Sequence, residues 1–157
     1  MKHIIISGTQ DTGKTTVVIR LKNLLIEKGY EIKEIKEESE QDFLGLLYKN
    51  EKLILVNSFS DTEYYIRKAK ELIECNEIHI MITAIRNNND SMRSYMMEKL
   101  NLSFLDEQNE NGINSYMEIP LAKVTKRYDK ENAIEWYNKK IVNLISTLIS
   151  NEPYKLI

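Results

Sequence analysis

Residues 8–15 read Gly-Thr-Gln-Asp-Thr-Gly-Lys-Thr, the most informative stretch of the sequence. Four residues separate Gly8 from Gly13, and Lys14 and Thr15 follow directly. Because glycine lacks a Cβ, the backbone can turn tightly at both positions and direct successive N–H groups inwards. This pattern is typical of a loop that binds phosphate groups.

The flanks of this loop have the composition of a strand and a helix. Residues 3–7 form a short apolar run, which predicts a strand buried on both faces. Residues after the loop recur at helical spacing until Gly29: Val17, Val18, Leu21, Leu24 and Leu25. The loop would then join a strand to the N-terminus of a helix, whose partial positive charge favours an anion.

The remaining sequence predicts alternating strands and helices. We expect strands at residues 31–35, 43–48, 53–56, 78–82 and 115–119, and helices at residues 60–75, 90–100 and from 129 onwards. Residues 43–57 would form a β-hairpin, which inserts an antiparallel strand into a mostly parallel sheet. The expected fold is therefore a three-layer α/β/α sandwich, with residues 1–157 as a single domain.

Several element boundaries also have local signals. Ser60 and Glu63 match a capping box at the start of a helix, and residues 83–86 are expected to leave the preceding strand. Pro120 is expected to end the last strand, and Asp129 to cap the final helix. One face of that helix would be apolar, with Ile134, Tyr137, Ile141, Leu144, Ile145 and Leu148.

The overall composition excludes some classes of site and partner. A net charge of −2 gives no general attraction to nucleic acid, and the single Cys75 excludes an internal disulfide or a cysteine cluster. His3 and His79 lack ligand-like spacing, so we interpret both as structural. No signal peptide or membrane-length apolar run is present, which predicts a cytoplasmic protein without a membrane partner.

In open α/β sheets, ligands bind beyond the carboxyl ends of the strands, where several polar residues are expected. Asp61 could assist a Mg²⁺ ion or accept a proton, or it could simply start a helix. Arg86 and Arg93 flank a polar loop and could neutralise phosphate charge, although an ordinary solvated loop would look the same. Arg127 belongs to a later basic group that could contact a nucleotide or only solvent.

From Gly8 to Thr16, with the flanking strand and helix, the sequence resembles the P-loop nucleoside-triphosphatase superfamily. The resemblance covers residues 1–30 and implies that Lys14 lies near the β- and γ-phosphates while Thr15 holds Mg²⁺. It also implies the full set of nucleotide-binding loop residues: Gly8, Thr9, Gln10, Asp11, Thr12, Gly13, Lys14, Thr15 and Thr16. A small-molecule nucleoside triphosphate, ATP or another, would be the ligand.

The rest of the chain loosely resembles small P-loop kinases of the nucleoside-monophosphate-kinase type. The short length, the weak acidic signature after the strands, and the lid-like position of Arg86 and Arg93 support this resemblance. The sequence departs from that type by lacking a long arginine-rich lid and a clear monophosphate-binding segment. It also lacks the Asn-Lys-x-Asp guanine-binding motif of regulatory GTPases.

The leading expectation is a Mg²⁺- and ATP-dependent phosphotransferase that acts on a nucleotide or another small phosphate acceptor. Lys14, Asp61, Arg86 and Arg93 are its candidate catalytic residues, with Thr15 and Asp61 as candidate metal ligands. The alternative is a binding or switch module that hydrolyses ATP or GTP slowly, with a protein or nucleic-acid partner. An acceptor-dependent release of ADP would distinguish the two.

Overall fold

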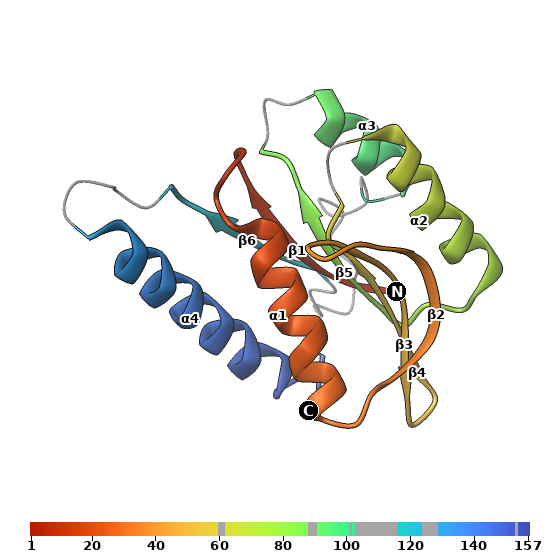
Figure 1. The fold of residues 1–157 in the computed structure, drawn as a ribbon. Coiled ribbons are helices and arrows are strands. Elements are labelled where there is room, and N and C mark those ends of the chain that lie inside the picture. Colours follow the sequence, from red (N-terminus) through yellow and green to blue (C-terminus); the bar gives the residue numbers. More distant parts are fainter. Residues whose placement is uncertain (60–61, 88–90, 101, 103–115, 124–128, 153) are drawn as a thin grey trace.

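The computed structural model describes residues 1–59, 62–87, 91–100, 102, 116–123, 129–152 and 154–157 (Figure 1). The elements, in chain order, are β1 (Lys2–Gly8), α1 (Lys14–Glu27), β2 (Glu31–Glu38), β3 (Phe43–Lys49), β4 (Lys52–Asn57), α2 (Glu63–Cys75), β5 (Ile80–Ile85), α3 (Ser91–Lys99), β6 (Tyr116–Leu121) and α4 (Lys130–Ile149). The predicted strand–loop–helix arrangement around residues 8–15 is therefore confirmed.

The strands form one sheet in the order β2-β3-β4-β5-β1-β6. β1 lies between β5 and β6 and is parallel to both, and β4 is parallel to β5. β3 is antiparallel to both β2 and β4, which confirms the hairpin predicted at residues 43–57. Helices α1 and α4 cover one face of the sheet and α2 and α3 the other, so the α/β sandwich is also confirmed (Figure 1).

Alternation along β1 sends side chains into both layers of the core. Ile4 and Ile6 pack beneath α1 and α4, whereas Ile5 packs on the side of α2 and α3. A strand buried on both faces needs apolar residues throughout, which explains the continuous run at its centre. Ser7 lies two positions after Ile5 and therefore faces the α2 and α3 side.

Several predicted strand boundaries were wrong. β2 runs to Glu38 rather than ending at residue 35, and β5 begins at Ile80 rather than at residue 78. The fifth strand runs to Ile85 because Thr83 continues the pairing with β1 and its hydroxyl is satisfied, accepting a hydrogen bond from Asn57 Nδ2 at 3.2 Å. Pro120 does not end β6 but pairs in register with Ser7. β6 has β1 as its neighbour on one side and lies at the edge of the sheet, where a missing N–H is tolerated.

The helix boundaries were predicted with mixed success. Asp129 caps α4 as expected, because its Oδ1 accepts a hydrogen bond from the N–H of Asn132 at 3.2 Å. The capping box was wrong: α2 begins at Glu63, with Thr62 in the capping position, and Ser60 lies outside the described residues. Leu144 is half-exposed rather than buried, because the α4 stripe that meets the core is narrower than the sequence suggested.

The C-terminal segment packs against the start of the sheet. Tyr154 Oη donates a hydrogen bond to the carbonyl oxygen of His3 at 2.9 Å, and Tyr30 Oη donates to that of Leu156 at 3.1 Å. Burial raises the pKa of Tyr154 to about 12, so its hydroxyl remains a donor well into the alkaline range. Among the described residues, no helix is long and apolar enough to cross a membrane.

Candidate functional site

The loop between β1 and α1 has a tightly turned backbone. Asp11 and Gly13 have φ angles of 61° and 84°, in the left-handed region where glycine is most easily accommodated. Space is limited at Gly8, where an added Cβ would lie 2.6 Å from Thr12 Oγ1. Gly8 also has a positive φ, of 154°, so the backbone favours glycine at both positions, and close packing restricts Gly8 further.

Hydrogen bonds inside the loop converge on the carbonyl oxygen of Thr9. Lys14 Nζ donates to this oxygen at 2.8 Å, and Thr12 Oγ1 donates to it at 2.9 Å. Lys14 is only 8% exposed, so its ammonium group is held within the loop rather than extended into solvent. The loop therefore brings a cation close to its own backbone turn.

The N-terminus of α1 adds a further preference for an anion. Gly13 occupies the N-cap position and provides no side-chain hydrogen bond to the first turn of the helix. The first N–H groups of a helix lack partners within the helix, and they favour negative charge. Together with Lys14, this helix end can bind a phosphate or another multiply charged anion.

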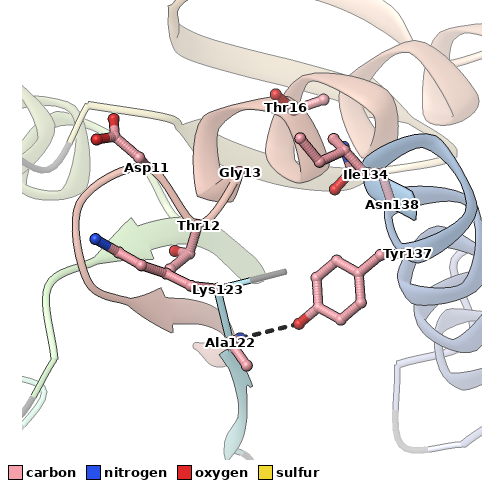
Figure 2. Close-up of a pocket in the computed structure, with 9 residues that line it drawn as sticks. All are labelled: Asp11, Thr12, Gly13, Thr16, Ala122, Lys123, Ile134, Tyr137 and Asn138. Carbon is pink, nitrogen blue, oxygen red and sulfur yellow. Dashed lines mark hydrogen bonds between the residues drawn. The ribbon is translucent and has the colours of Figure 1, made fainter. Parts of the chain in front are cut away.

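A hollow of about 200 Å³ lies between this loop and α4, and we call it the α4 hollow. Figure 2 shows the residues that line it: Asp11, Thr12, Gly13, Thr16, Ala122, Lys123, Ile134, Tyr137 and Asn138. Tyr137 Oη accepts a hydrogen bond from the N–H of Ala122 at 3.0 Å, which ties the chain after β6 to the helix. The aromatic ring therefore forms a fixed wall of the α4 hollow.

Asn138 is the most informative polar residue of the α4 hollow. Its side chain is only 6% exposed, yet it makes no hydrogen bond to any part of the chain that the structure describes. A Cβ added to Gly13 would lie 3.2 Å from Asn138 Oδ1, so the carboxamide lies directly against the loop. The polar atoms of this carboxamide are not among the fully buried atoms that lack a partner, so they are open to the α4 hollow and can bond to a ligand there.

A second hollow, of about 300 Å³, lies on the opposite side of β1, and we call it the α3 hollow. Its lining comes from the end of β1, the segment after β5, and β6: Ser7, Gly8, Thr9, Asn87, Glu118, Pro120 and Leu121. Glu118 pairs in register with Ile5, so its side chain shares a face with Ser7. Residues 8 and 9 line the α3 hollow and residues 11–13 line the α4 hollow, which places the loop between them.

An ion pair between α3 and β6 borders the α3 hollow. Arg93 Nη1 and Nη2 donate to the two carboxylate oxygens of Glu118 at 2.9 and 2.8 Å, and Nη1 also donates to the Arg86 carbonyl oxygen at 3.1 Å. The Arg93 and Glu118 side chains are 12% and 23% exposed. Arg93, predicted to contact phosphate, therefore has its guanidinium engaged by Glu118.

The structure brings only some of the other predicted residues together. Arg86 follows Ile85, which pairs in register with Ser7, so Arg86 lies beside the start of the loop. Thr15 is half-buried in the first turn of α1. Asp61 and Arg127 lie outside the described residues, and their predicted roles remain predictions.

β4 ends at Asn57, where many P-loop proteins would have an acidic residue. Asn57 is fully buried, its Nδ2 donates to Thr83 Oγ1, and its Oδ1 accepts from the N–H of Phe59 at 3.0 Å. Both ends of the carboxamide are thus used inside the protein. The end of β4 contributes a structural hydrogen-bond network, and not a free ligand, to the site.

Three residues of the candidate site were not expected from the sequence: Ser7, Glu118 and Asn138. Asn138 interrupts the apolar pattern of the final helix and Ser7 ends the apolar run of the first strand, so both carried a weak signal. No sequence signal pointed to Glu118, because its place in the site depends on an ion pair with Arg93, which lies on a helix distant in sequence. No protein-family model and no curated protein matches this chain, so the site is interpreted from its own chemistry.

Proposed function

We propose that this protein is a P-loop phosphotransferase that binds Mg²⁺–ATP at residues 8–16 and transfers the γ-phosphoryl group to a small acceptor. The observation that carries the proposal is the loop itself. A left-handed turn, an uncapped helix N-terminus and the inward-held Lys14 combine in one short segment. This combination suits a chain of phosphate groups better than a single carboxylate, because donors are spread along the whole turn.

The α4 hollow supports a nucleoside as the other half of the ligand. It adjoins the loop at Gly13 and joins an apolar wall, made by Tyr137 and Ile134, to the unpartnered carboxamide of Asn138. An amide has both donor and acceptor atoms and can bind a ribose hydroxyl or the edge of a base. If the base and the sugar bind in this hollow, the phosphate groups of the same nucleotide can reach the N–H groups of the loop.

Thr15 and the phosphates would hold Mg²⁺. Among the described residues, no group of three His, Cys, Asp or Glu side chains could hold a metal ion. Mg²⁺ usually keeps several waters and binds few protein side chains when phosphates are present. When bound, the ion would neutralise charge on the phosphates, and Asp61 remains a proposed additional ligand.

The chain's own residues would position and stabilise the transferred group. Lys14 and the loop N–H groups would hold the β- and γ-phosphates, and Arg86 would approach from the end of β5. Phosphoryl transfer spreads negative charge over the transferred group, so positioned cations lower its barrier. The cytoplasm supplies ATP and is the proposed compartment.

Replacement of Lys14 tests this proposal. Lys14→Ala should weaken ATP binding by at least about tenfold, because it removes the cation held inside the loop. The measurement is calorimetric titration of the protein with ATP in the presence of Mg²⁺.

Lys28→Ala is the matched control, since it makes the same change of charge at the exposed far end of α1. It should bind ATP as the wild type does. Equal ATP affinity in Lys14→Ala and Lys28→Ala would refute the assigned site.

A further inference from the structure

The α3 hollow differs from the α4 hollow in the charge of its lining. Its polar side chains are Ser7, Thr9, Asn87 and Glu118, and none of the described lining residues is a cation. The neighbouring guanidinium of Arg93 points both of its terminal nitrogens at Glu118. The described lining therefore offers hydrogen-bonding groups and a carboxylate but no cationic side chain.

Ser7 supplies the second observation. It is only 3% exposed, and its hydroxyl makes no hydrogen bond within the part of the chain that the structure describes. The Ser7 hydroxyl is not among the fully buried polar atoms that lack a partner, so its oxygen is open to the hollow. Because Ser7 lines the α3 hollow, a ligand there could supply the missing hydrogen bond.

Glu118 narrows the chemistry of that ligand. An ionised carboxylate can only accept hydrogen bonds, so the ligand must donate them. Because Arg93 neutralises this carboxylate, a phosphate dianion is disfavoured only by the lack of a cation among the described lining residues, whereas a hydroxyl group can donate to a Glu118 oxygen. The fixed geometry imposed by Arg93 means that the position of the carboxylate is set before the ligand arrives.

We propose that the α3 hollow binds the phosphoryl acceptor, and that the acceptor is an uncharged small molecule with several hydroxyl groups rather than a phosphate ester. This rests on the function proposed above. In the transfer, the acceptor oxygen bonds to the γ-phosphorus as the bond from that phosphorus to the β,γ-bridging oxygen breaks. ADP leaves with that electron pair, and the hydroxyl proton passes to water. Ser7 and Glu118 orient the acceptor.

The test compares matched pairs of acceptors by ADP release at saturating Mg²⁺–ATP. The uncharged probes are glycerol, ribose and uridine, and their phosphorylated counterparts are glycerol 3-phosphate, ribose 5-phosphate and UMP. At least one uncharged probe should raise ADP release, and its phosphorylated counterpart should raise it less.

Two variants separate the hollows. Ser7→Ala breaks no hydrogen bond of the described chain, and it should raise the KM for the active uncharged probe by about tenfold while the KM for ATP stays the same. Asn138→Ala should raise the KM for ATP and leave the KM for the uncharged probe unchanged, because Asn138 lines the α4 hollow.

Three results would overturn the inference: greater stimulation by the phosphorylated probes, no stimulation by any uncharged probe, or an unchanged acceptor KM in Ser7→Ala. If the wild type binds ATP and one of these results is found, the inference alone fails. If the wild type does not bind ATP, the proposed function fails as well.

Discussion

Ser7 and Asn138 share an unusual combination of burial and missing hydrogen bonds. Both are more than nine-tenths buried, and neither side chain has a partner among the described residues. Each side chain lines a hollow on its own side of the loop, so we propose both as positions where ligand atoms bind. Asn57 and Thr83, which are also buried, show the ordinary case, since they satisfy each other.

Gly13 allows the loop conformation to be tested at a single residue. Gly13→Ala places a Cβ at a φ of 84° and 3.2 Å from Asn138 Oδ1. We expect stability to fall by about 1 kcal/mol and ATP affinity to fall by at least about tenfold, because the N–H groups of the turn are displaced. Thermal denaturation and ATP titration measure the two effects.

Gly29→Ala provides the control for backbone strain. Gly29 has a similar φ of 88°, and an added Cβ would meet only Lys49, no closer than 3.7 Å. It should lose a comparable amount of stability and bind ATP normally. A similar loss of ATP affinity in both variants would indicate general destabilisation rather than a specific role of the loop.

At the scale of elements, α4 is the helix that completes the α4 hollow, which we propose as the nucleoside site. Asp129 caps the helix, and Ile134, Tyr137 and Asn138, about one and a half to two and a half turns later, line the hollow beside the loop. The N-terminal end of this helix therefore determines how the α4 hollow is closed. Its cap can be tested directly.

Asp129→Ala should lower the free energy of unfolding by about 1 kcal/mol, because the N–H of Asn132 loses its acceptor at the start of α4. Urea denaturation measures this change. Asp129→Asn keeps a side-chain oxygen in the same place and should retain most of the stability. Equal losses in the two variants would show that the charge, and not the hydrogen bond, is what stabilises the helix.

The elements themselves were largely predictable from the sequence. Apolar periodicity gave the strands and helices on both sides of residues 8–15, and the alternation of elements gave the sandwich. Boundaries failed where tertiary contacts overrode local signals: Thr83 stays in a strand because Asn57 satisfies it, and Pro120 is tolerated because β6 is at an edge. Helix α2 begins at Glu63 rather than at the capping box, with Thr62 in an extended conformation.

The site was predictable only where it is local in sequence. Residues 8–15 form a contiguous pattern, so their conformation and the position of Lys14 follow from the amino acids themselves. The ion-pair partner of Arg93 could not be predicted in this way. Glu118 lies on a strand 25 residues away, and the pair forms only when α3 packs on the sheet. Sequence spacing has no information about such pairs.

At the scale of the whole molecule, His3 links acid stability to the packing of the chain ends. Its carbonyl oxygen accepts from Tyr154, and neither ring nitrogen has a hydrogen-bond partner among the described residues. Burial, and secondarily the nearby N-terminal charge, lower the pKa of His3 from 6.5 to about 4. The folded protein therefore binds this proton less readily than the unfolded chain does.

Between pH 6.5 and about 4, the unfolded state gains a proton that the folded state lacks, so stability should fall as the pH falls. One such group contributes at most about 1.4 kcal/mol per pH unit. His3→Phe should flatten the dependence of the unfolding free energy on pH in this window, as measured by urea denaturation at several pH values. An unchanged slope would show that other groups determine acid stability.

The two outer strands of the described sheet have a consequence for the behaviour of the protein at high concentration. β2 reads Glu-Ile-Lys-Glu-Ile-Lys-Glu-Glu and is therefore rich in charge. Its pairing is irregular between Ile32 and Glu34 and between Ile35 and Glu37, and β6 contains Pro120. Charges, bulges and proline each discourage a further strand from adding to an edge. Neither border is a ready template for amyloid-like stacking, so self-association through cross-molecular strand pairing is disfavoured while the helices remain in place.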